Sequence, residues 1–216
     1  MFIREGTYVP VMDLLKGLII QSGNDATVAL AEHISGTEAA FADVMNQYAE
    51  QLGMINTHFV NSTGLPAEGH RTTARDLSVL AKHLIFDHPE NYRLYKEKKF
   101  KYNNIEQSNR NLLLFWDPKV DGLKTGHTEE AGFCLVSSAE QNGMRLISVV
   151  MGASSERARA RESQKLLTYG FRYYETHRLF EDEQPLQTTP LWLGEKNELS
   201  LGVKDGVYIT IPRGQQ

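Results

Sequence analysis

Apolar residues recur every three or four positions in four stretches of the first 90 residues, and this period predicts amphipathic helices. The four stretches cover residues 12–21, 25–35, 38–52 and 74–88. Thr37 and Thr73 directly precede the third and fourth stretches, where a threonine hydroxyl can accept a hydrogen bond from a free N–H of the first turn. The chain is therefore expected to begin with a helical half.

Residues 55–73, between the third and fourth predicted helices, contain asparagine, glycine and proline at short intervals and show no regular period. Connections of this length without regular structure are more often functional than idle. We therefore expect this loop to have a function. No regular element is assigned to the polar stretch that follows Pro89.

The second half of the chain changes to short apolar segments that are typical of strands. The strands predicted in this way cover residues 120–125, 133–139 and 145–151. Asn142-Gly143, between the last two, is a strong signal of a tight hairpin. A helical period returns over residues 156–174, and after Phe180 short apolar segments alternate with glycine and proline. The last pattern predicts the opening strands of a small all-β module.

Composition narrows the class of protein. Of the 216 residues, 41% are hydrophobic and 23% are charged, as in a globular chain. The formal net charge of −4 gives no electrostatic reason to expect nucleic acid as a partner. Cys134 is the one cysteine, so a disulfide within the chain is impossible. The longest apolar runs are much too short to span a bilayer.

Familiar cofactor and metal patterns do not fit the sequence. The segment Gly122-Leu123-Lys124-Thr125-Gly126 is unlike a phosphate-binding loop, which has glycine directly before its Lys-Thr pair, where this chain has leucine. The histidines, the cysteine and the carboxylates are not spaced as metal ligands are. We therefore expect neither a cofactor nor a metal.

Two short motifs remain, Ser22-Gly23-Asn24 and Lys124-Thr125-Gly126, about a hundred residues apart. A lysine ammonium beside a serine hydroxyl can hold that hydroxyl ready to pass a proton to a leaving amine. An asparagine amide can donate to and accept from a substrate amide at the same time. A glycine at the end of a strand lets a peptide backbone approach that strand closely. Each motif is weak alone, and their joint occurrence is the informative observation.

Around these motifs the chain resembles the low-molecular-mass penicillin-binding proteins, specifically the serine-type D-alanyl-D-alanine carboxypeptidases with the penicillin-recognising fold. The matching segments are residues 18–26, 73–77, 109–111, 120–128, 144–150, 167–171 and 211–214. The resemblance implies an α+β fold, with an antiparallel sheet packed against helices and a helical subdomain. It places an incomplete carboxypeptidase domain at residues 1–180 and the start of a C-terminal β domain at residues 181–216.

The resemblance also implies roles for single residues. Ser22 and Lys124 are the expected catalytic residues, which pass the proton to the departing D-alanine. Read in isolation, Ser22 is a helix cap and Lys124 a solvated lysine at a strand end, and the neighbouring matches favour the catalytic interpretation.

Five further residues are expected to bind substrate. Asn24 would hold a substrate amide, and Arg110 and Thr125 would bind the terminal carboxylate, with Arg110 as a fork-shaped partner. The alternative for Arg110 is a structural ion pair. Gly126 would allow close approach of the substrate, and the backbone N–H of His127 would form part of the oxyanion hole. A role for the His127 imidazole stays open.

The family's first motif, Ser-x-x-Lys, supplies its nucleophile, and no serine of this sequence has a lysine three residues later. In the family this motif precedes Ser-x-Asn, so we expect it upstream of Met1, and we expect the β domain and a C-terminal membrane segment to be cut off as well. The chain is therefore expected to be truncated at both ends and inactive as given.

The function implied for the whole protein is removal of the terminal D-alanine from peptidoglycan pentapeptides through an acyl-enzyme, with β-lactams as substrate mimics. The expected partners are the pentapeptide stem ending in D-Ala-D-Ala, β-lactam antibiotics and the inner membrane surface, and the expected location is the periplasm. Two alternatives remain open, a β-lactamase relative and a non-catalytic remnant that binds peptidoglycan or β-lactams.

Overall fold

The computed structural model describes residues 1–215 and begins with the four helices that the apolar period predicts. They are α1 (Val11–Gln21), α2 (Asn24–Ser35), α3 (Glu38–Gln51) and α4 (Ala74–Asp87). Thr37 and Thr73 cap α3 and α4 as expected, because each hydroxyl accepts a backbone N–H three residues later at 3.1 Å. Residues 55–73 form the irregular connection, closed by two backbone hydrogen bonds between His58 and Arg71.

The stretch after Pro89 holds more regular structure than the sequence suggested. Its elements are α5 (Pro89–Tyr92), the 3-10 helix η1 (Arg93–Lys96), β1 (Lys99–Tyr102), β2 (Ile105–Ser108) and α6 (Leu113–Trp116). The β1–β2 hairpin escaped prediction because both strands are only four residues long and largely exposed, and because the polar–aromatic alternation of β1 has no counterpart in β2. Its turn residues Asn103 and Asn104 both have positive φ, 47° and 63°, and asparagine tolerates this conformation well. This asparagine pair is the feature of the sequence that could have predicted the hairpin.

A three-stranded sheet in the order β3-β4-β5 forms the centre of this part of the chain. Its strands are β3 (Val120–Thr128), β4 (Gly132–Gln141) and β5 (Met144–Ala153). Asn142 and Gly143 have φ of 53° and 75°, which confirms the predicted tight hairpin. β3 pairs antiparallel with β4, with Lys124 opposite Val136. Within residues 1–215, the other edge of β3 has no strand beside it.

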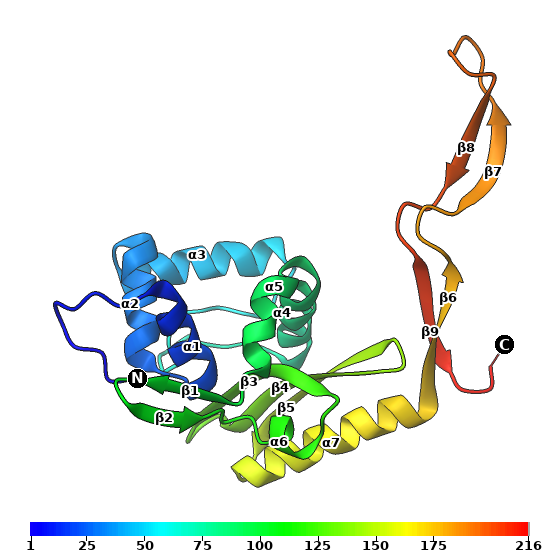
Figure 1. The fold of residues 1–216 in the computed structure, drawn as a ribbon. Coiled ribbons are helices and arrows are strands. Elements are labelled where there is room, and N and C mark those ends of the chain that lie inside the picture. The colour runs from blue at the N-terminus through cyan, green and yellow to red at the C-terminus, as the bar shows by residue number, and fades with distance from the viewer. Residues whose placement is uncertain (216) are drawn as a thin grey trace. The chain divides into compact units, whose positions relative to one another are not determined.

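The chain forms two compact units, the first comprising residues 1–141 and 145–167. In this unit, α1 to α4 lie on one side of the sheet, and α7 (Glu156–Tyr173) begins on the other (Figure 1). Ala81 and Ile85 of α4 pack with Tyr92 and with Leu123 of β3 in one buried cluster. Burial of each large side chain contributes about 2 kcal/mol, so this cluster fixes α4 against the strand that carries Lys124.

The second unit comprises residues 142–144 and 168–216. It contains β6 (Tyr174–Phe180), β7 (Pro185–Pro190), β8 (Glu198–Gly202) and β9 (Val207–Pro212). β6 pairs antiparallel with β9, and β7 pairs antiparallel with β8. The expectation of an α+β fold followed by the first strands of a β module is thus confirmed. None of the helices within residues 1–215 combines the length and apolarity that crossing a membrane requires.

Candidate active site

All seven residues singled out from the sequence line one cleft of about 460 Å³ in the first unit. They are Ser22, Asn24, Arg110, Lys124, Thr125, Gly126 and His127. The α1–α2 turn, the segment after β2 and the end of β3 supply these residues. The fold therefore brings together side chains that the sequence separates by about a hundred positions.

Ser22 occupies the turn between α1 and α2 in a left-handed conformation, with φ 55° and ψ 44°. The N–H of Ser22 donates to the Leu18 carbonyl at 3.1 Å, and that of Gly23 donates to the Gly17 carbonyl at 3.0 Å, so both backbone donors at the end of α1 are satisfied. A serine in this region of backbone space is uncommon, and such conformations concentrate at functional sites. Asn24 follows as the exposed first residue of α2.

Lys124 projects from β3 towards the Ser22 turn. Its Nζ donates to the Oγ of Ser22 and, at 2.9 Å, to the Thr125 carbonyl. Burial lowers the pKa of Lys124 to about 8, and repulsion from Arg110 and Arg159 adds to the shift. The ammonium still predominates at neutral pH, but a pKa this close to neutrality allows Lys124 to give up and regain a proton easily.

Arg110 is exposed in the cleft and is held between two buried asparagines. Asn109 donates to the Glu97 carbonyl at 3.0 Å and accepts the N–H of Asn111 at 2.9 Å. Asn111, which is fully buried, donates to the Gly122 carbonyl at 3.0 Å. Because Gly122 precedes Lys124 by two residues on β3, these contacts fix the backbone of Arg110 beside that strand.

The end of β3 forms one side of the cleft. Thr125 is buried, whereas Gly126 and His127 are exposed. The His127 ring stacks on Phe133, its partner across the β3–β4 ladder, with the ring centroids 3.9 Å apart. Gly126 and His127 are therefore accessible from the cleft, where the His127 N–H was predicted to act.

Sequence reasoning missed Arg159, a cleft residue on α7 that is only 3% exposed. Its Nη1 donates to the Gly126 carbonyl at 3.1 Å, and its guanidinium lies 5.5 Å from the centre of the Phe133 ring. Glu156 forms the accompanying ion pair at 3.6 Å. An arginine in a helix rich in charged residues gives no signal in the sequence, since only packing shows that this one turns inward.

Sequence reasoning also missed which part of the long loop lines the cleft. Ser62, Thr63, Gly64 and Leu65 of the long loop line it. The length and composition of residues 55–73 indicated a functional loop without showing which of its residues would face the cleft. The cleft thus contains the three cations Arg110, Lys124 and Arg159 and the one carboxylate Glu156, an arrangement suited to an anionic ligand.

Comparison with known families matches residues 1–155 to the D-alanyl-D-alanine carboxypeptidase family. Residues 174–216 match the C-terminal domain of penicillin-binding protein 5. The chain is 50% identical over its whole length to D-alanyl-D-alanine carboxypeptidase DacC of Escherichia coli, of which it covers 54%. It is 38% identical over 99% of its length to DacF of Bacillus subtilis, of which it covers 56%. The chain thus spans about half the length of these curated relatives.

Solved structures that resemble the chain are also penicillin-binding proteins. Penicillin-binding protein 5 of Haemophilus influenzae matches the whole chain with a TM-score of 0.91 and 46% identity, and the match covers 63% of that protein. Penicillin-binding protein D2 of Listeria monocytogenes, solved in a cefotaxime-bound form, matches 76% of the chain and 67% of its own length with a TM-score of 0.70 and 35% identity. Together with the family match over residues 1–155, these likenesses show that the chain belongs to the D-alanyl-D-alanine carboxypeptidase family, the serine-type peptidase family S11 of penicillin-binding proteins.

Proposed function

We propose that this chain carries the substrate-binding and proton-transfer part of a D-Ala-D-Ala carboxypeptidase, which removes the terminal D-alanine from peptidoglycan pentapeptides and binds β-lactams. The observation that carries the proposal is the contact between Lys124 and Ser22 in a cleft that also holds Asn24, Arg110 and Thr125. We further propose a periplasmic location at the inner membrane, which rests on the family alone.

The proton-transfer step assigns Ser22 and Lys124 to the leaving group. A nucleophilic serine, whose proton passes to the lysine of the Ser-x-x-Lys motif, attacks the carbonyl between the two D-alanines, the carbon–nitrogen bond breaks, and the departing amine takes a proton. Ser22 donates that proton from its hydroxyl and is then reprotonated by the Lys124 ammonium beside it. Water then hydrolyses the acyl-enzyme. Because none of the 216 residues is a serine with lysine three positions later, the chain alone is expected to release no D-alanine.

Carboxylate recognition is the second component. A free C-terminal carboxylate would be bound by the Arg110 guanidinium and the Thr125 hydroxyl, where the surrounding cations already favour an anion. This contact explains the choice of a carboxypeptidase over an endopeptidase reaction, since a substrate without the free carboxylate leaves Arg110 unpaired in the cleft.

The remaining residues position the rest of the peptide. Asn24 lies at the opening of α2, where its amide can pair with a substrate amide. The N–H of His127 would stabilise the oxyanion of the tetrahedral intermediate. Gly126, which lacks a side chain, lets the substrate backbone lie against the free edge of β3 as an added strand.

Calorimetry with the 216-residue chain tests the proposal. The probe is N,N′-diacetyl-L-lysyl-D-alanyl-D-alanine, and the matched control is the same peptide with a C-terminal carboxamide. We expect the acid to bind with a dissociation constant on the order of 1 mM and the amide to bind at least tenfold more weakly, because a charge-assisted hydrogen-bond pair is lost. Equal affinity of the acid and the amide would contradict carboxylate recognition by Arg110.

A non-catalytic remnant that binds peptidoglycan or β-lactams is the second candidate. It predicts that peptide binding survives when Ser22, Asn24 and Lys124 are all replaced by alanine. The carboxypeptidase proposal predicts that this triple variant loses measurable binding.

A further inference from the structure

Residues 61–65 are the part of the long loop that lies at the cleft, and this segment is here called the loop wall. Ser62, Thr63, Gly64 and Leu65 line the cleft, and Leu65 is 52% exposed. An exposed leucine in the lining of a cleft that also holds three cations offers a contact surface for the apolar part of a ligand whose charged end lies at Arg110.

A second cavity, of about 600 Å³, lies behind the loop wall. Thr63 and Leu65, together with Asn24, line both this cavity and the cleft. The loop wall is therefore a thin partition with open space on each side. Without close packing behind it, the wall loses the dispersion contacts that hold an ordinary loop, and its position depends on hydrogen bonds.

Those hydrogen bonds come from Asn61, Glu38 and Thr63, and the Thr63 hydroxyl donates to Asn61 Oδ1 at 3.1 Å and accepts the Leu65 N–H at 3.4 Å. Asn61 organises the wall internally, since its Oδ1 accepts the N–H of Gly64 at 2.7 Å and its Nδ2 donates to the Leu65 carbonyl at 2.9 Å. Glu38 ties the wall to the body of the unit. Its Oε1 accepts both the N–H of Ser62 at 3.1 Å and the Ser62 hydroxyl at 2.6 Å.

We propose that Glu38 is a positioning residue for the cleft: it holds the loop wall at the place from which Leu65 contacts a peptide bound there. Without this anchor the wall can move into the cavity behind it, and the cleft widens. The identity of the ligand rests on the proposed function, whereas the anchoring of the loop does not.

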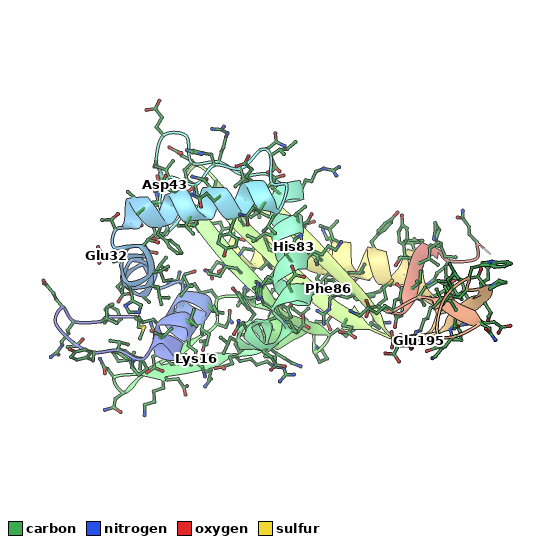
Figure 2. The ribbon with its side chains drawn as sticks, turned by 90° about the horizontal axis from the view of Figure 1, so that it is seen from above. Lys16, Glu32, Asp43, His83, Phe86 and Glu195 are labelled. Atoms are coloured by element: carbon green, nitrogen blue, oxygen red, sulfur yellow. The ribbon has the colours of Figure 1, made fainter. Side chains whose placement is uncertain are left out.

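A competing explanation treats Glu38 only as a negative charge in the first turn of α3, where it favours the helix dipole. Glu38→Ala and Glu38→Gln separate the two, since both remove the charge and only the glutamine keeps an acceptor oxygen for Ser62. Thr37 still caps α3 in either variant, so the helix is expected to form. Asp43→Ala removes an exposed carboxylate from the same helix, where Figure 2 labels it, and is the matched control.

The first measurement is hydrogen exchange by NMR on the 216-residue chain without ligand. We expect exchange of the Ser62 amide to accelerate at least tenfold in Glu38→Ala and to change less than threefold in Glu38→Gln and in Asp43→Ala. Unchanged exchange in Glu38→Ala would overturn the anchoring, as would equal acceleration in both Glu38 variants, which would assign the effect to the charge.

The second measurement is titration with the diacetylated D-alanyl-D-alanine peptide. Glu38→Ala is expected to bind at least fivefold more weakly than the unaltered chain, and Glu38→Gln within twofold of it. If the unaltered chain itself shows no binding, the proposed function fails while the exchange result still decides the anchoring. If the unaltered chain binds and Glu38→Ala binds equally well, the positioning role is wrong.

Discussion

The two sides of the cleft are constructed differently. On one side, Lys124 to His127 belong to β3, whose backbone is paired with β4 and whose Leu123 lies in a buried apolar cluster. On the other side, the loop wall has no regular structure and is positioned by hydrogen bonds from side chains to the backbone. The comparison teaches that a strand is held mainly by backbone pairing and apolar packing, whereas an irregular wall depends on specific side chains for its attachment.

The largest effect is expected from a substitution that removes a support of β3, on the strand side of the cleft. Asn111 is fully buried and pairs with the Gly122 carbonyl and the Leu113 N–H, so Asn111→Ala leaves two backbone groups without partners. We expect the free energy of unfolding to fall by about 3 kcal/mol, measured by urea denaturation. The exposed Asn91→Ala is the control and should change it by less than about 0.5 kcal/mol. A loss below about 1 kcal/mol in Asn111→Ala would show that β3 does not depend on this contact.

The next largest effect is expected from a substitution that removes the contacts holding the start of the long loop, residues 56 and 57. Asp76, at 2% exposure, accepts the Asn56 N–H at 2.9 Å and the Thr57 hydroxyl at 2.7 Å. Asp76→Ala is expected to cost about 2 kcal/mol in urea denaturation, because two partly buried donors lose a charged acceptor. It should also accelerate amide exchange throughout residues 56–65 and leave the amides of β3 unchanged. Equal acceleration in β3 would mean that the two sides are not built independently.

A smaller effect concerns the charge of Lys124. Its pKa of about 8 lies below the value of 10.5 for a free lysine, so the unfolded chain holds this proton to higher pH than the folded chain does. Folding stability should therefore rise with pH between about 8 and 10.5 through this group. Lys124→Met removes that gain. The unfolding free energy of the variant minus that of the unaltered chain should therefore be lower at pH 10 than at pH 7 by about 1 kcal/mol, a figure that allows for partial solvent screening.

Urea denaturation of both chains at the two pH values measures this difference. Lys82→Met, at an exposed position of α4, is the control, and its effect should be the same at both pH values. A pH-independent effect of Lys124→Met would contradict the lowered pKa.

The smallest expected effect concerns the electrostatic repulsion between Arg110 and Lys124. Arg110 repels the charged form of Lys124 and so contributes to its lowered pKa. Arg110→Gln should raise that pKa by a few tenths of a unit, measured by NMR titration of the lysine ε-methylene group. Arg93→Gln, at an exposed position of η1, should leave it unchanged. A lower pKa in Arg110→Gln would reverse the assigned sign.

The same contrast explains what the sequence could predict. Regular elements carry a period, so the four helices, the β4–β5 hairpin and the position of Lys124 on a strand were all predictable. The two motifs indicated Ser22 and Lys124 because their residue types match a known chemistry. The Glu38–Ser62 and Asn46–Phe59 contacts leave no such trace, because a single side chain that bonds a distant backbone follows no spacing rule. Arg159 escaped for a related reason, since its inward direction depends on how α7 packs.

The central claim is that both sides of the cleft bind one peptide ligand. Residue-resolved NMR during titration with N,N′-diacetyl-L-lysyl-D-alanyl-D-alanine tests it most directly. We predict that the amides of Thr125, Gly126 and His127 shift together with those of Ser62, Gly64 and Leu65, all with one common dissociation constant. Shifts confined to one side, or two different dissociation constants for the two sides, would contradict the account.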